Sequence, residues 1–131
     1  MPPQPIPDDI RRFVLTSIAS VPHLEALLLL RSAQGTFWSA ATVAGRLYIG
    51  EQLALAVMQD LCRAGMLAPR SPDDGSIAYR YQPASDAMGV LIDRLAALYA
   101  SHLLEVTYLI HSALDRKAHM FADAFKWRKD S

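Results

Sequence analysis

Residues 38–81 read WSAATVAGRLYIGEQLALAVMQDLCRAGMLAPRSPDDGSIAYRY, and this stretch decides the fold. Ser39 can cap a helix, since its hydroxyl accepts a hydrogen bond from an amide of the first helical turn. The apolar residues that follow recur at helical spacing. The stretch therefore predicts a short helix to about residue 47, with an inner stripe of Val43, Ala44 and Leu47.

A tight turn and a second helix follow directly. The turn is Tyr48-Ile49-Gly50, and the helix is expected from Gly50 to Ala64. Gly65 can end this helix, because glycine adopts the left-handed conformation of a helix C-terminus without steric cost. At 100° per residue, one face of the helix is apolar and points inward. That face consists of Ala54, Val57, Met58, Leu61 and Ala64.

Two short strands are expected after the second helix, over 66–68 and 77–81. The residues between them, Ser71-Pro72-Asp73-Asp74-Gly75, favour a turn. The sequence therefore predicts one small β-hairpin.

Two more helices are expected before this stretch. An extended segment of residues 1–6 contains three prolines, which fix φ and remove amide donors. The first helix should then run to about Ala19 and the second over 21–33, with Ser20 as its N-cap. Leucines cover most of the circumference of the second helix, which predicts a buried, central position.

A long helix is expected from Ser85 to about Leu114, since no proline follows Ser85. Its apolar residues alternate in steps of four and three, the spacing of a coiled-coil seam. A small core cannot cover a helix about 45 Å long, so the seam predicts a homodimer interface. The alternative is that the helix folds back over Leu24–Leu30 of its own chain. The seam consists of Met88, Ile92, Leu95, Tyr99, His102, Val106 and Leu109.

The bulk composition is that of one ordinary folded domain. The 131 residues are 52% hydrophobic, which argues against disorder, and 13 basic residues balance 13 acidic ones. A lone cysteine, Cys62, allows no internal disulfide. The N-terminus lacks the pattern of a signal peptide, and no apolar run approaches the roughly 20 residues of a membrane span. We therefore expect a cytoplasmic protein that does not enter a membrane.

The order of these elements resembles that of the bacterial winged helix-turn-helix transcription regulators. The likeness is greatest to small dimeric kinds with a C-terminal dimerisation helix, and the whole chain is similar to a group of small proteobacterial proteins of this type. The residues that carry it are Trp38-Ser39, Val43-Ala44, Leu47-Tyr48-Ile49, Ala54, Val57, Leu61, Gly65-Met66-Leu67 and Tyr79-Arg80-Tyr81.

The resemblance implies a mainly α fold with a small β-hairpin. Its divisions would be an extended segment over 1–6, a winged-helix domain over 7–83 and a helical dimerisation extension over 84–131. It also implies a homodimeric regulator that binds double-stranded DNA in a sequence-specific way and is not an enzyme.

In such regulators the helix after the turn lies in the major groove. Glutamine can pair with adenine, arginine with guanine, and small apolar side chains can touch thymine methyl groups. Phosphate contacts need basic residues, and Asp73 and Asp74 at the hairpin tip would oppose them. The expected base-contacting residues are Gln52, Leu55, Ala56, Gln59 and Arg63. The expected phosphate-contacting residues are Arg46, Arg70 and Arg80, with Arg11, Arg12 and Arg31 as further candidates.

A second interpretation is a winged-helix module that binds another protein and not DNA. The zero net charge favours it, because a nucleic-acid binder is often basic. So does the groove-facing helix, which has no lysine and carries a single arginine at its end. The contact would then involve Leu55, or the C-terminal aromatic residues Phe121, Phe125 and Trp127.

Other chemistry has little support in the sequence. His111, Asp115 and His119 lie four residues apart in succession, so each histidine could share a metal with the aspartate, but a polar helix end is the simpler reading. His102 is expected at the dimer seam, where its titration could make association pH-sensitive. Cys62 is expected to pack and not to react. No phosphate loop, metal motif or nucleophile elbow is present, so we expect no cofactor, metal or catalytic site.

Overall fold

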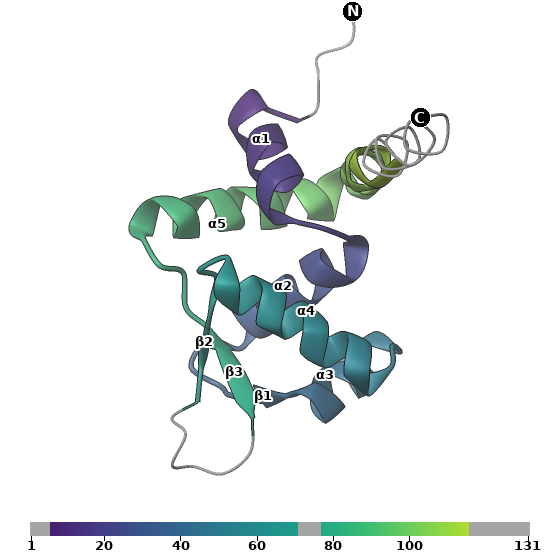
Figure 1. Ribbon diagram of the computed structural model, residues 1–131. Helices are drawn as coiled ribbons and strands as arrows, with labels where there is room; N and C mark the ends of the chain where they lie inside the picture. Colours follow the sequence, from purple (N-terminus) through teal and green to yellow (C-terminus); the bar gives the residue numbers. More distant parts are fainter. Residues whose placement is uncertain (1–5, 71–76, 116–131) are drawn as a thin grey trace, which may run out of the picture.

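A computed structural model describes residues 6–70 and 77–115 of the chain. Figure 1 shows two halves, with α1, α5 and a following helix above, and α2, α3, α4 and a small sheet below. In chain order the elements are α1 (Asp8–Ser17), α2 (Val21–Ser32), β1 (Trp38–Ser39), α3 (Ala40–Leu47), α4 (Glu51–Arg63), β2 (Leu67–Pro69), β3 (Ala78–Tyr81), α5 (Asp86–Ser101) and a helix over Leu103–Asp115.

Serine hydroxyls cap three of the helices, as the sequence predicts. Ser20 accepts a hydrogen bond from the amide of His23 at 3.3 Å, and Ser39 from that of Thr42 at 3.2 Å. Ser85 caps α5 in the same way. Each bond satisfies an amide that has no partner within its helix.

The helix-turn-helix consists of α3 and α4, which pack on each other. Tyr48 ends α3 in the left-handed conformation, and Gly50 precedes α4 in an extended one. Gly65 follows α4 with a positive φ of 85°, which confirms its predicted role as the stop. The inward face of α4 matches the prediction at Ala54, Val57, Met58 and Leu61, which are all buried, but Ala64 is exposed because it lies at the C-cap, beyond the last turn of the helix.

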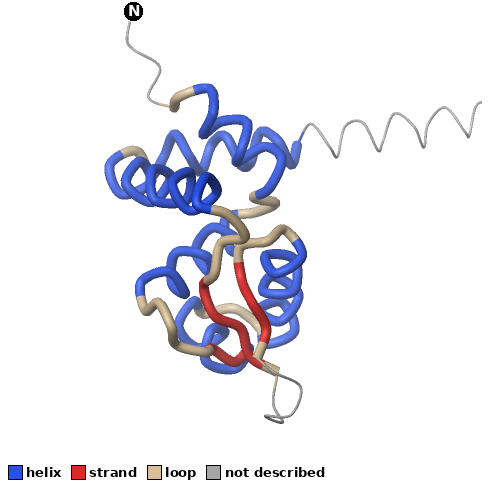
Figure 2. Tube along the Cα trace, turned by 90° about the vertical axis from the view of Figure 1, so that its left-hand side faces the viewer, coloured by secondary structure: helices blue, strands red, loops and turns tan. Residues whose placement is uncertain are grey.

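The sheet has three strands, one more than the sequence predicts. The strand order is β1-β3-β2, and both pairings are antiparallel. The strands are drawn in red in Figure 2. Trp38 of β1 pairs with Tyr79, and Leu67 of β2 pairs with Tyr81. A helix, a short strand, two helices and a two-stranded wing in this order form a winged helix-turn-helix, so the predicted fold class is confirmed.

The core of the lower half is built around α2. Leu24, Leu27 and Leu30 are fully buried, and α2 contacts α3, α4 and β3. The prediction of a central, leucine-rich helix is therefore confirmed. The sheet and the helices share one continuous hydrophobic core, which extends to α5.

The long C-terminal helix was predicted as continuous, and this was wrong. The chain breaks at His102, whose φ of −132° and ψ of 50° are not helical, and the two helices are bent by 114°. The carbonyl of His102 accepts a hydrogen bond from the amide of Val106, which starts the second helix. The bend allows Val106, Leu109 and Ile110 to be buried within the chain.

Packing and ion pairs join α1 to α5, and an ion pair joins α5 to α2. The α1 helix packs on α5, and Arg94 of α5 forms an ion pair with Asp9 of α1. Arg31 of α2 forms a second ion pair with Asp93 of α5 at 2.9 Å. The division of the chain into a domain over 7–83 and an extension over 84–131 stays a prediction. The α1 helix, which precedes residue 84, packs on α5, which follows it.

Across the described ranges, no single helix is long and apolar enough to cross a membrane. Two bent pairs, α1 with α2 and α5 with Leu103–Asp115, reach that length and apolarity together.

Candidate nucleic-acid interface

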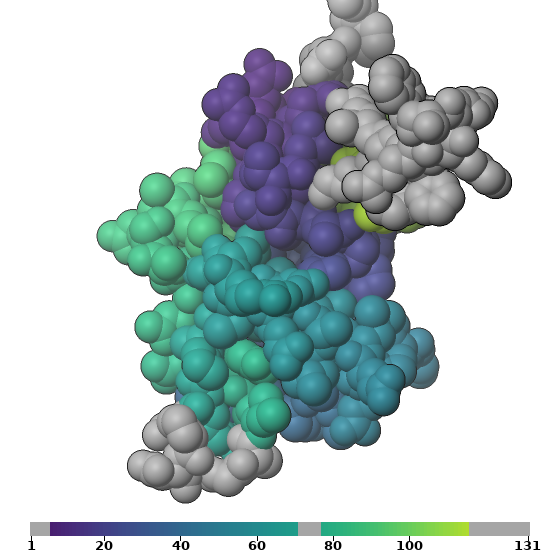
Figure 3. All heavy atoms as spheres, viewed as in Figure 1, coloured from purple at the N-terminus to yellow at the C-terminus, as the bar shows by residue number. Residues whose placement is uncertain are grey.

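The α4 helix lies at the front of the lower half, with its outer side at the surface (Figures 1 and 3). Gln52, Ala56, Gln59 and Arg63 are exposed on it. The two amide side chains are therefore available to donate and accept hydrogen bonds, as base-edge contacts require.

Leucine placement on α4 differs from the expectation. Leu55, expected on the outer face, is half-buried and packed against the core. Leu53 is the exposed leucine, with 47% of its surface accessible. A helical wheel places both leucines on the flanks of the apolar face, so the neighbouring elements decide which one is covered. An apolar contact from α4 to a partner would therefore involve Leu53.

Three arginines contact the rings of two aromatic residues that are neighbours in the sequence. Arg70 and Arg80 both lie over the ring of Phe37, with guanidinium carbons 5.3 and 5.2 Å from its centroid. Arg46, in the last turn of α3, lies 5.6 Å from the centroid of the Trp38 ring. We call Arg46, Arg70 and Arg80 the arginine cluster. It joins the C-terminal end of α3 to the base of the wing.

The aromatic residues beneath the cluster hold it in place. A guanidinium group over an aromatic ring is attracted to the negative face of the ring and keeps its hydrogen-bond donors. The Nε of Arg80 also donates to the side-chain oxygen of Gln82 at 3.1 Å. The ring contacts orient these cationic groups, and orientation of this kind suits an anion-binding surface. The sequence reasoning had no role for Phe37, because the strand that it precedes was not expected.

Trp38 itself is buried, and its indole Nε1 has no hydrogen-bond partner within the described residues. A buried donor without a partner costs about 1–3 kcal/mol. Its ring therefore contributes through packing and through Arg46, and not through its polar atom.

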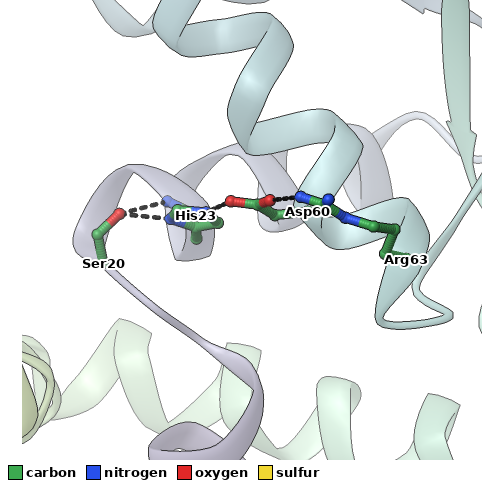
Figure 4. A network of polar contacts seen from close by, with 4 residues as sticks. All are labelled: Ser20, His23, Asp60 and Arg63. Carbon is green, nitrogen blue, oxygen red and sulfur yellow. Dashed lines mark hydrogen bonds and ion pairs between the residues drawn. The ribbon is translucent and has the colours of Figure 1, made fainter.

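Arg63 is ion-paired with Asp60 of the same helix. Asp60 also accepts a hydrogen bond from Nε2 of His23 at 2.9 Å, and Nδ1 of His23 is bonded to the hydroxyl of Ser20 at 2.5 Å. Figure 4 shows the four side chains in one row from α2 to α4. The hydrogen bond from His23 is the largest of the contacts that lower the pKa of Asp60.

This row brings together a serine, a histidine and an aspartate, which sequence reasoning did not expect. Its role is structural, because its hydrogen bonds join the N-terminal end of α2 to α4. The Ser20 hydroxyl is engaged as the N-cap of α2, and His23 is 8% exposed. The row fixes α4 against α2 near the C-terminal end of α4. Arg63 is held within it by the ion pair with Asp60.

The remaining candidate cations lie elsewhere. Arg31 is ion-paired with Asp93, and Arg11 and Arg12 are on α1, in the upper half of Figure 1. The structure therefore does not bring these three to the exposed face of α4. Asp73 and Asp74, expected at the wing tip, lie outside the described residues, as do Phe121, Phe125 and Trp127.

The expected dimer seam is largely internal to one chain. Ile92, Leu95, Val106 and Leu109 are buried by the chain's own residues, so they cannot form the contact between two copies. Met88, Tyr99 and His102 are half-buried. The prediction is wrong for Ile92, Leu95, Val106 and Leu109, because the chain's own core covers them, and it stays a prediction for Met88, Tyr99 and His102. The helix pair nevertheless leaves other apolar side chains exposed, namely Val90, Leu103, Leu104, Tyr108 and Leu114.

The other candidate groups are His111, Asp115, His119 and Cys62. Within 6–70 and 77–115, no group of three histidine, cysteine or acidic side chains is placed to hold a metal ion. His119 of the suggested metal pair lies outside those ranges. Cys62 is a half-buried free thiol of α4, packed against the core.

No protein-family model and no curated protein sequence matches the chain. Among solved structures, the crystal structure of a MarR family transcription regulator is similar, with a TM-score of 0.44 and 22% sequence identity. The alignment covers 90% of this chain and 82% of that one. A likeness at this level does not establish a function, which has to be inferred from the residues of this chain.

Proposed function

We propose that this protein is a sequence-specific, homodimeric DNA-binding regulator of transcription, which inserts α4 into the major groove. The observation that carries the proposal is the arginine cluster. A chain with no net charge gathers three arginines at the end of α3 and the base of the wing, beside the helix that would enter the groove. Local positive charge of this kind is what phosphate contacts require.

The two parts of the surface would have separate roles. Gln52 and Gln59 on α4 would contact base edges, because an amide side chain can donate to and accept from adenine. The arginine cluster would contact phosphates on either side and set the register of α4 in the groove. Sequence preference would thus come from α4, and most of the affinity from Arg46, Arg70 and Arg80.

Dimerisation would use the exposed side chains of the upper half. Leu104 and Tyr108 are four residues apart on one helix, so they share a face, and they are 77% and 75% exposed. A second copy covering this face would place the two α4 helices for the two halves of a palindromic site. The buried seam residues would act indirectly, by holding the two C-terminal helices at their bend.

The test compares the DNA affinity of a variant that lacks the arginine cluster with that of a variant that lacks two exposed arginines elsewhere. A variant with Arg46, Arg70 and Arg80 changed to alanine should lose most of its affinity for DNA. A variant with Arg11 and Arg12 changed to alanine removes exposed cations of α1 and should bind as the wild type does. Equal losses in both variants would mean that binding follows overall charge and not the proposed surface.

A second candidate function is protein binding through α4, and the exposure of Leu53 favours it. An exposed leucine on a groove-facing helix also suits an apolar contact with another protein. In that case Leu53→Glu would abolish a complex that survives high salt. The arginine variants would leave that complex unchanged.

A further inference from the structure

Tyr48 has a backbone conformation that tyrosine rarely adopts. It ends α3 with φ 57° and ψ 44°, and it is the one non-glycine residue with positive φ in the described part of the chain. Glycine is the usual residue at a left-handed helix end, because a Cβ atom is unfavourable there. The chain therefore keeps a bulky side chain where glycine would be more stable.

The tyrosine ring does not repay this cost by packing. The side chain of Tyr48 is 95% exposed, the largest exposure of any large apolar or aromatic residue in the described structure. Its neighbours Leu47 and Ile49 are the ones that pack against the core. The turn thus needs a left-handed residue at 48, but the fold does not need the ring.

The position of the ring links it to the candidate interface. Tyr48 lies two residues after Arg46 of the arginine cluster and two before Gly50, the N-cap of α4. In helix-turn-helix proteins the N-terminal residues of the second helix reach the base edges. A side chain that projects from the turn immediately before that helix would meet the sugar-phosphate backbone at the edge of the groove.

We propose that Tyr48 is a DNA-contact residue whose hydroxyl donates a hydrogen bond to a backbone phosphate while its ring packs on the adjoining deoxyribose. Tyrosine is one of the side chains that bind phosphate oxygens in protein–DNA complexes. The retained strain is then explained by function, since strained residues persist where the surrounding structure and a ligand require them. This inference rests on the proposed function and adds a contact to the same surface.

Two variants test the contact, and a third serves as the control. Tyr48→Gly removes the ring and the steric conflict, so it should raise the Tm by a few degrees while weakening DNA binding about 10-fold. Tyr48→Phe should weaken binding to a smaller extent, because it removes the hydroxyl and keeps the ring. Gln34→Ala removes an exposed side chain after α2, outside the proposed DNA-binding and dimer surfaces, and should leave the affinity for DNA unchanged.

The salt dependence identifies the kind of contact. A tyrosine hydroxyl releases no counterion, so both Tyr48 variants should keep the wild-type slope of log K against log salt. An unchanged affinity of Tyr48→Gly on a fragment that the wild type binds would overturn the role of Tyr48 and leave the proposed function standing. Failure of the wild type to bind any fragment would overturn both. A stabilised Tyr48→Gly with weakened binding at constant slope is the outcome that we expect.

Discussion

His23 on α2 donates a hydrogen bond from Nε2 to Asp60 on α4 at 2.9 Å, across 37 positions of sequence. The histidine is buried, whereas the carboxylate is 42% exposed and also contacts Arg63. This pair ties the helix that we place in the groove to the central helix of the core. The orientation of α4 relative to α2 depends in part on this one pair.

Asp60→Asn should therefore destabilise the fold by about 1 kcal/mol, a value limited by solvent screening of the exposed carboxylate. The contacts of Asp60 lower its pKa below the reference value of 3.8, so their stabilisation is full above that value and is lost as the pH falls through the folded-state pKa. Urea unfolding at several pH values measures the difference between variant and wild type. That difference should be constant above about pH 5 and shrink below pH 4.

Glu105→Gln is the control for this experiment, because Glu105 is exposed on the C-terminal helix. It should leave the stability and its pH dependence unchanged. A constant difference between Asp60→Asn and wild type down to pH 2 would show that the carboxylate charge has no part in the connection.

Arg80→Ala should weaken binding to all DNA sequences alike. Each phosphate that the protein no longer neutralises should reduce the slope of log K against log salt by about 0.9. Fluorescence anisotropy at four salt concentrations, on one specific and one scrambled duplex, gives both the affinity and the slope. A weakening confined to the specific duplex would instead assign Arg80 to a base.

Gln52→Ala should weaken binding to the preferred DNA sequence only, in contrast to Arg80→Ala. A bidentate contact to one base contributes about 1–3 kcal/mol of discrimination, so affinity should fall on the preferred site and stay constant on scrambled DNA. The salt slope should not change. Gln59→Ala gives the same comparison further along α4, and Gln34→Ala, exposed after α2, is the matched control. Equal weakening on both duplexes would argue against base readout by α4.

Leu104→Glu should dissociate the dimer, because it places a charge on the exposed face shared with Tyr108. Sedimentation analysis should show a monomer that keeps the wild-type circular dichroism spectrum. Glu105→Gln, at the neighbouring exposed position, should stay dimeric. A wild-type protein that is already monomeric at tens of micromolar concentration would contradict the dimer and leave the winged-helix surface of one chain intact.

Local features of the structure followed well from the sequence. The caps at Ser20, Ser39 and Ser85 and the stop at Gly65 depend on a few neighbouring residues, so residue type is enough to predict them. The buried face of α4 follows in the same way, because one core covers one side of the helix.

Features that depend on residues far apart in the sequence could not be predicted from it. The β1 strand has two residues, and its partner β3 lies about 40 positions away, so no local pattern marks it. The Ser20–His23–Asp60 row could not be predicted for the same reason, since His23 and Asp60 are 37 positions apart. The seam spacing continues through His102, yet burying Val106 and Leu109 in the chain's own core requires a bend there.

The candidate surface was predicted in its parts but not in its arrangement. Arg46, Arg70 and Arg80 could be chosen from their expected positions on α3 and the wing. Their convergence on Phe37 and Trp38 needs the third strand, which places those two rings beside the wing. The sequence predicts Tyr48 in the turn, but neither its left-handed backbone nor its exposure is visible at that level.

The most direct test is a titration of the pure protein against a pool of fragments from its own genome, at low and near-physiological salt. We predict that a small set of fragments stays bound at the higher salt, with affinity far above the pool, and that these share a palindromic element. Uniform weak binding that disappears at the higher salt would contradict sequence-specific DNA binding through α4.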